Sequence, residues 1–218
     1  MFVQIYGVTT AEDAAAVDRL APDAIGVVLD EGIPTWDSVD AESARRIVET
    51  IARARIVALS LSTDPDRIRA TAEMLAPDVV HLARAHNIET ATLDRIRSAV
   101  EPAQLMLTVP VDGPDSLSSA RRLERSADCL LLDTKHPTTG VVGASGRTHD
   151  WNLSAAIVRA IEIPVILAGG LGPENVRAAI TTVRPYGVDS ETRTSRDADR
   201  RRKDLAKVEE FITLARAA

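Results

Sequence analysis

The chain has 218 residues, of which 45% are hydrophobic and 27% charged, and its formal net charge at pH 7 is −6. This balance is typical of a single soluble domain, and the acidic charge argues against nucleic-acid binding because no basic stripe stands out. We interpret the basic run 200–203 as the solvent-exposed start of a terminal helix. The only cysteine, Cys129, excludes a disulfide within the chain. With no recognisable signal peptide or membrane-spanning run, we expect a cytoplasmic protein without a membrane partner.

Short apolar runs alternate with amphipathic segments along the whole chain. The apolar runs predict strands at 3–8, 24–29, 55–61, 79–82, 104–109, 129–133, 164–168 and 187–189. Helical periodicity is typical of 11–20, 41–54, 65–75, 91–100, 116–126, 153–161, 173–183 and 201–215. Eight successive strand–helix units predict a single-domain (β/α)8 TIM barrel over residues 1–218. An open doubly wound sheet shares the alternation and is the competing architecture.

Several polar residues mark the ends of these elements. Thr10 and Asp64 precede predicted helices and are expected to be N-caps. Gly169-Gly170 follows a predicted strand, and Pro173 is expected near the first position of the next helix. Backbone N–H groups exposed by a glycine pair suit a phosphate group, although the pair could equally be a tight turn.

The chemistry of a TIM barrel lies at the carboxyl ends of its strands. That rule selects a short set of strand-end residues, namely Tyr6, Asp30, Leu61, His81, Val109, Asp133, Gly169, Gly170 and Asp189. The longest connection, 134–150, follows the sixth predicted strand and would cover the same face. Loops of this length are commonly functional.

Five blocks spread over the chain resemble one enzyme family. They are QIYGVT at 4–9, LLLDT at 130–134, GRTHDW at 146–151, LAGGLGPENV at 167–176 and KDLAKVEEF at 203–211. Their sequence and spacing resemble the phosphoribosylanthranilate isomerases of tryptophan biosynthesis. This resemblance implies a (β/α)8 barrel and an Amadori rearrangement of an aminoaldose phosphate to an aminoketose phosphate. It also implies a general acid for the ring oxygen and a base for the proton at C2 of the sugar.

The resemblance places the family's acid on Asp133 and the family's cysteine base on Tyr6. A tyrosine titrates near 10 and is a weak base at neutral pH without a cationic neighbour, so His81 is the second candidate base. For each of these three side chains a purely structural role is the alternative. Gly169 and Gly170 are expected to hold the phosphate.

Three further blocks depart from the family's pattern. The serine-proline-arginine after the second strand reads 33–36 IPTW, and the glutamine-leucine-histidine-glycine block reads 81–84 HLAR. The Ser-Ser-Gly after the eighth strand reads Glu191-Thr192-Arg193, which weakens half of the family's phosphate cradle. Thr192 and Arg193 are nevertheless candidate phosphate ligands, with Arg147 as a contact from the long loop. A surface salt bridge is the alternative for Arg193.

The leading hypothesis is a phosphosugar isomerase of this family. A relative acting on another phosphorylated small molecule, as isomerase, epimerase or lyase, is the alternative, together with a non-catalytic phosphate-binding barrel. No cofactor is expected, since Walker and dinucleotide fingerprints are missing. No metal is expected either, because His81, Asp133, His136 and Asp30 lack recognised ligand spacing. We expect a monomer or a homodimer with a small phosphorylated substrate.

Overall fold

The computed structural model describes residues 1–32, 34–134 and 148–218. Eight parallel strands form a closed barrel, and a two-residue strand, β3, pairs with the outer part of β2. The strands are β1 (Phe2–Ile5), β2 (Ala24–Leu29), β3 (Ser38–Val39), β4 (Arg55–Ser60), β5 (Val79–Leu82), β6 (Gln104–Val111), β7 (Cys129–Thr134), β8 (Val165–Leu167) and β9 (Gly187–Ser190).

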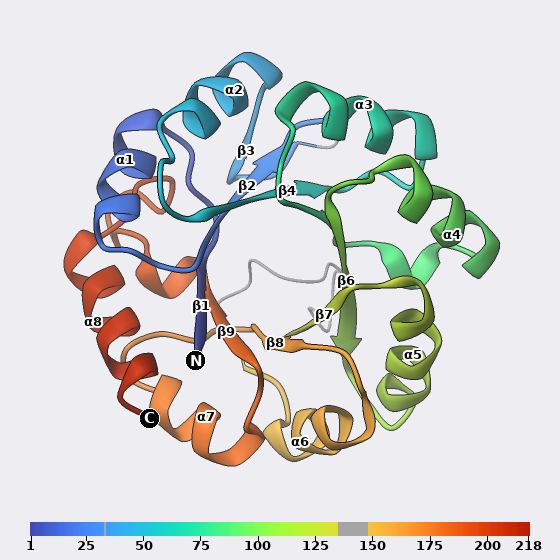
Figure 1. Ribbon diagram of the computed structural model, residues 1–218. Helices are drawn as coiled ribbons and strands as arrows, with labels where there is room; N and C mark the ends of the chain where they lie inside the picture. The colour runs from blue at the N-terminus through green and yellow to red at the C-terminus, as the bar shows by residue number, and fades with distance from the viewer. Residues whose placement is uncertain (33, 135–147) are drawn as a thin grey trace.

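The closure of the sheet decides between the two architectures. The strand order is β1-β9-β8-β7-β6-β5-β4-β2-β3, and β1 also pairs with β2. Because β1 is hydrogen-bonded on both sides, to β9 and to β2, the sheet has no free edge there, which excludes the open doubly wound sheet. Figure 1 shows the strands as an inner ring enclosed by the helices. The predicted TIM barrel is confirmed.

Eight α-helices of the described residues surround the barrel (Figure 1). They are α1 (Ala11–Arg19), α2 (Ala41–Glu49), α3 (Pro65–Leu75), α4 (Thr90–Ala99), α5 (Ser116–Leu123), α6 (Trp151–Ala160), α7 (Val176–Val183) and α8 (Leu205–Arg216). None of these is long and apolar enough to cross a membrane. The predicted helical segments agree with these helices except at some of their ends.

The predicted caps of two helices are confirmed. The Thr10 hydroxyl accepts a hydrogen bond from the Asp13 N–H (3.2 Å), and the Asp64 carboxylate accepts one from the Asp66 N–H (3.0 Å). At α7 the prediction is wrong: the helix begins at Val176, and Pro173 lies in a turn before it. These caps satisfy N–H groups that have no partner within the helix.

The basic run 200–203 is not the exposed start of a helix, because α8 begins only at Leu205. Arg202 donates two hydrogen bonds of 2.9 Å to the Asp13 carboxylate of α1. Lys203 is fully buried, and its Nζ donates to the backbone oxygen of Glu191 (3.0 Å). The interpretation failed because the carboxylates and carbonyls that bind these cations come from distant parts of the chain.

Alternate residues of each strand face the inside and the outside of the barrel. The outward residues, such as Val3 and Ile5 of β1, join the large core between sheet and helices. The inward residues form a smaller cluster of Tyr6, Ala24, Val28, Val57, Val79, Met106, Cys129, Leu131, Ile166 and Ala168. Polar groups lie above this cluster at the carboxyl ends of the strands, where they line a pocket.

Candidate active site

A pocket opens at the carboxyl ends of the strands, above the inner cluster. It is lined by Tyr6, Val28, Thr35, Asp37, Leu59, Leu61, His81, Ala83, Thr108, Leu131, Asp133, Asp189 and Glu191. Its volume is about 80 Å³, small beside ligand pockets of roughly 300–1,000 Å³. Only part of a ligand therefore reaches between these side chains.

Strand periodicity explains which predicted strand-end residues reach the pocket. Leu131 and Asp133 are two apart on β7 and both face inward. Thr108 lines the pocket, so its neighbour Val109 faces outward into the large core. Asp30 is exposed and its carboxylate accepts a hydrogen bond from Gly32 N–H. The expectation that Val109 and Asp30 lie at the site is wrong.

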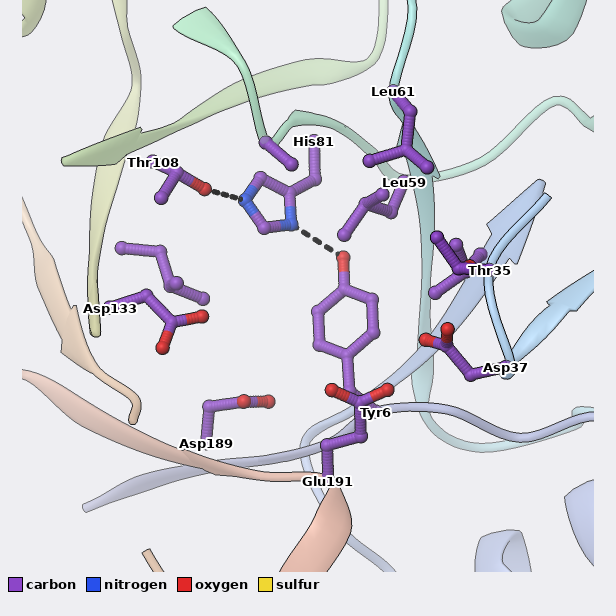
Figure 2. A pocket seen from close by; sticks show the side chains of 13 residues that line it. Tyr6, Thr35, Asp37, Leu59, Leu61, His81, Thr108, Asp133, Asp189 and Glu191 are labelled. Carbon is purple, nitrogen blue, oxygen red and sulfur yellow. Dashed lines mark hydrogen bonds between the residues drawn. The ribbon is translucent and has the colours of Figure 1, made fainter. Parts of the chain in front are cut away.

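The ring of Tyr6 fills the centre of the barrel mouth. It packs so closely on Gly26 of β2 that a Cβ there would clash with the ring. Its hydroxyl shares a 2.7 Å hydrogen bond with Nδ1 of His81, and Nε2 of His81 shares one of 2.6 Å with the Thr108 hydroxyl. Figure 2 shows this chain of three side chains across the pocket.

The buried surroundings of Tyr6 and His81 favour the uncharged forms of both side chains. Burial raises the pKa of Tyr6 well above 10, and the charges of Asp189 and Glu191 raise it further. Burial also lowers the pKa of His81 to about 3. Both ring nitrogens of His81 already have hydrogen-bond partners. Proton abstraction by Tyr6 or His81 stays a prediction, and this environment opposes it.

Asp133 of β7 is half-buried and Asp189 of β9 is buried, and no lysine or arginine of the described residues forms an ion pair with either carboxyl. Burial raises the pKa of Asp133 to about 7, against the opposing effect of a 2.6 Å hydrogen bond from the Thr134 N–H. Burial and the charge of Asp133 raise the pKa of Asp189 to about 8, although the Gln4 amide donates to it (3.2 Å). A carboxyl with a pKa near 7 can donate or accept a proton at physiological pH.

Glu191 and Asp37 form a second group of carboxyls in the pocket. Burial and the neighbouring Asp37 carboxylate raise the pKa of Glu191 well above its ordinary value. Lys203 lies behind this group, and burial lowers the pKa of the ammonium to about 8 against the effect of the nearby carboxylates. Among the described residues that line the pocket there is no arginine or lysine.

The turn after β8 has the backbone geometry of a glycine pair. Gly169 and Gly170 have φ angles of 80° and 61°, a region that favours glycine. A Cβ on Gly169 would lie 2.9 Å from Nδ1 of His149. The Asn175 side chain fixes the turn by donating to Gly170 O (3.0 Å) and accepting from Gly172 N–H (2.9 Å). No described residue accepts a hydrogen bond from the N–H of Gly169 or Gly170.

The other predicted phosphate ligands are Thr192 and Arg193, which follow β9, and Arg147 of the long loop. Thr192 and Arg193 begin a short 3-10 helix directly after β9, and Arg193 donates to the Glu174 carboxylate (2.6 Å) at the surface. This ion pair is the alternative that the sequence left open. The predicted loop contact Arg147 lies outside the described residues, as does His136. Among the described residues no group of three or more metal-ligating side chains converges.

Sequence reasoning did not select Asp37 or Glu191 as site residues. Asp37 lies in the connection between β2 and β3, where no strand-end rule applies. Glu191 follows the last residue of β9 and was noted only as a departure from a phosphate cradle. Trp36, one residue before Asp37, is not among the residues that line the pocket. The guanidinium carbon Cζ of Arg200 lies 4.5 Å from the centroid of the Trp36 ring.

The sequence profile of the N-(5'phosphoribosyl)anthranilate (PRA) isomerase family matches residues 3–213. The chain belongs to this family. A PRA isomerase of Methanocella arvoryzae is 37% identical over 98% of this chain and 97% of that protein. Family membership agrees with the barrel and with the position of the pocket at the carboxyl ends of its strands.

Solved structures of PRA isomerases have the same fold. The enzyme from Thermotoga maritima has a TM-score of 0.81 and is 28% identical, over 99% of this chain and 98% of that one. A complex of a PRA isomerase with reduced 1-(o-carboxyphenylamino)-1-deoxyribulose 5-phosphate has a TM-score of 0.79 at 25% identity, with 99% and 98% coverage. The likeness therefore extends over the complete barrel.

Proposed function

We propose that this chain is an isomerase that carries out the Amadori rearrangement of a phosphoribosyl amine, with N-(5'-phosphoribosyl)anthranilate as the leading substrate. Its relatives with 32–37% identity over nearly their full length are named for this reaction. The observation that carries the proposal is the juxtaposition of a half-buried acid, Asp133, with a glycine turn at the mouth of the same barrel.

The substrate phosphate would bind at the turn of Gly169 and Gly170. Their N–H groups have no acceptor among the described residues, and oriented backbone N–H groups suit a phosphate. The Ser190 hydroxyl donates to Leu171 O (2.7 Å), which ties this turn to the loop that carries Thr192. We assign Thr192 and Arg193 to the rim of this site, where Arg193 already pairs with Glu174.

Asp133 would act as the general acid. With a pKa near 7, a large fraction of its carboxyl keeps its proton at neutral pH. It can give this proton to the ring oxygen as the bond from C1 to that oxygen breaks, leaving an iminium ion. We expect kcat/KM to fall as the pH rises above 7, because the deprotonated Asp133 cannot protonate the leaving oxygen.

We propose that this chain is a divergent member of its family, with Tyr6 in the place of the catalytic cysteine. The described part of the lining favours a second candidate function, because it holds four carboxyls and no arginine or lysine. A phosphoribosyl amine whose amine half bears no carboxylate would meet less repulsion there than anthranilate does.

The test is the rate at which the purified protein consumes PRA, followed by the loss of substrate fluorescence. Turnover on the order of 1–1,000 per second is the expected result for an enzyme of this kind. No turnover above background would reject anthranilate as the amine half, and the same assay with phosphoribosyl amines that lack a carboxylate would then test the second candidate.

The setting of the protein is part of the same proposal. We infer a cytoplasmic enzyme with a small phosphorylated substrate, as monomer or homodimer. Light scattering at several protein concentrations checks the oligomeric state, and a mass larger than that of two chains, each 23.4 kDa, would contradict it.

A further inference from the structure

The carboxyl of Glu191 reaches from the end of β9 to the end of β1. A Cβ built on Gly7 would lie 2.8 Å from Oε1 of Glu191 and 2.9 Å from its Cγ. Gly7 directly follows Tyr6, the position that the family resemblance assigns to the base. The Glu191 carboxyl, one residue after the end of β9, therefore lies beside Gly7, the residue that follows Tyr6.

Oε1 of Glu191 is shielded from solvent and no described N–H group donates to it, whereas the carboxyls of Glu191 and Asp37 are close enough to share one proton in a hydrogen bond. An acceptor in this state costs free energy unless a ligand or a proton satisfies it. The groups around it are Asp37 before β3, Asp189 of β9, Tyr6 after β1 and Lys203 before α8. Only Lys203 is cationic, and it holds the backbone oxygen of Glu191 rather than its carboxylate.

The Asp133 carboxyl of β7 and the Glu191 carboxyl after β9 both line the pocket. In Figure 2 Asp133 lies on one side of the Tyr6 ring and Asp37 on the other, with Glu191 in front of Tyr6. Asp189 is the nearer neighbour of Asp133, since the charge of Asp133 is a main cause of its raised pKa. An acid and a base that act on different atoms of one sugar need this kind of separation.

We propose that Glu191 is the base that removes the proton from C2 of the sugar, in place of the cysteine that the family resemblance aligns with Tyr6. The inference rests on the proposed isomerase function. The two departures from the family's pattern, tyrosine for cysteine after β1 and glutamate for serine after β9, then compensate each other. Tyr6 and His81 then have a structural role, as hydrogen-bonded side chains that line the pocket.

The step balances without another reactant. The proton leaves C2 for Glu191, the C2–H electron pair becomes the C1–C2 double bond, and the electron pair of the C1–N double bond returns to nitrogen. The resulting enolamine tautomerises, so that C1 gains a proton and C2 becomes the carbonyl. Asp133 has supplied the proton of the opened ring oxygen, and solvent restores both carboxyls.

The test compares Glu191→Gln with Glu209→Gln, the same chemical change at an exposed position of α8. Removal of a general base costs roughly 10²–10⁴-fold in kcat. We expect this loss for E191Q, with KM and melting temperature close to those of the original protein, and no loss for E209Q. A kcat for E191Q within tenfold of the original protein would overturn the inference, provided that the original protein turns over.

Glu191→Asp keeps a carboxylate but withdraws it by one methylene, and it carries the test if E191Q does not fold. We expect an intermediate kcat and a larger kinetic isotope effect from deuterium at C2, because proton transfer becomes slower. A lower kcat with an unchanged isotope effect would mean that Glu191 only supports the loop, and would overturn the inference. Absence of turnover by the original protein would instead reject the proposed function itself.

Discussion

Asp13 and Asp133 differ in the partners of their carboxyl groups and therefore in the direction in which their pKa values are shifted. Asp13 of α1 accepts two hydrogen bonds from Arg202 and one from the Lys203 N–H, each 2.9 Å. Burial alone would raise its pKa, but these bonds and the Arg202 charge lower it. Within residues 1–32, 34–134 and 148–218, Asp133 accepts one hydrogen bond, from a backbone N–H, and pairs with no such cation, and burial raises its pKa to about 7.

This difference indicates which carboxyl groups can transfer a proton near neutral pH. A carboxylate that is fully paired stabilises the fold only while it is charged, whereas one that is poorly solvated and unpaired holds a proton that it can transfer. In this protein the paired aspartate joins α1 to the segment before α8 and the unpaired one faces the pocket. The first is structural and the second belongs to the site.

The largest expected effect is that of Asp133→Asn on turnover. Loss of a general acid lowers kcat by roughly 10²–10⁴-fold. The fold should be unchanged, because the amide keeps the shape of the side chain, and circular dichroism checks this. Asp66→Asn, at an exposed position of α3, is the matched control. Turnover by D133N at the original rate would remove Asp133 from the mechanism.

The counterpart, Asp13→Asn, should destabilise the fold by about 3 kcal/mol, because it removes the buried carboxylate that pairs with Arg202 and leaves only the exposed Glu12 as its charged partner. The pKa of Asp13 is lowered in the folded state, so its contribution is present at neutral pH and disappears as the pH falls below about 4. Urea unfolding of both proteins at pH 7 and pH 3 measures the difference. An equal effect at both pH values would contradict the assigned ion pair.

Asp133→Asn should have the opposite effect on stability. The pKa of Asp133 is raised in the folded state, so its charged form costs stability as the pH rises from about 4 to about 7. We expect D133N to be more stable than the original protein at pH 8, by up to about 4 kcal/mol, because the pKa of Asp133 is raised from about 4 to about 7 and each tenfold in proton affinity corresponds to about 1.4 kcal/mol. The difference should disappear near pH 4. A D133N protein that is less stable than the original protein at pH 8 would contradict this expectation, because it would mean that favourable contacts outweigh the cost of burying the Asp133 charge.

The smallest effect is expected for Tyr6→Phe. This change removes the hydrogen bond to His81, worth about 1 kcal/mol, and leaves the packing on Gly26 in place. Turnover should fall less than tenfold if Tyr6 only positions the pocket. A loss of more than a hundredfold, at unchanged melting temperature, would instead identify Tyr6 as a catalytic residue, as the sequence resemblance suggested.

Much of the barrel could be predicted because strands and helices are encoded locally. The strand at Ala24–Leu29 and the helix at Pro65–Leu75 have the predicted bounds, and the cap at Asp64 is the predicted one. The predicted start of α7 was wrong because a side-chain hydrogen bond, which periodicity does not reveal, sets the preceding turn. Pro173 suits a first helical turn, but the Asn175 side chain holds the preceding glycines in a longer turn.

The sequence by itself determined the alternation of strands and helices, the family, and the position of Asp133 at a strand end, because these depend on periodicity and on motifs within a few residues. Only the tertiary structure decided that Lys203 is buried, that His81 is bound at both nitrogens, and that Glu191 lies over the end of β1. The physical reason is that burial and pairing set the charge of a side chain, and both come from residues far apart in the chain.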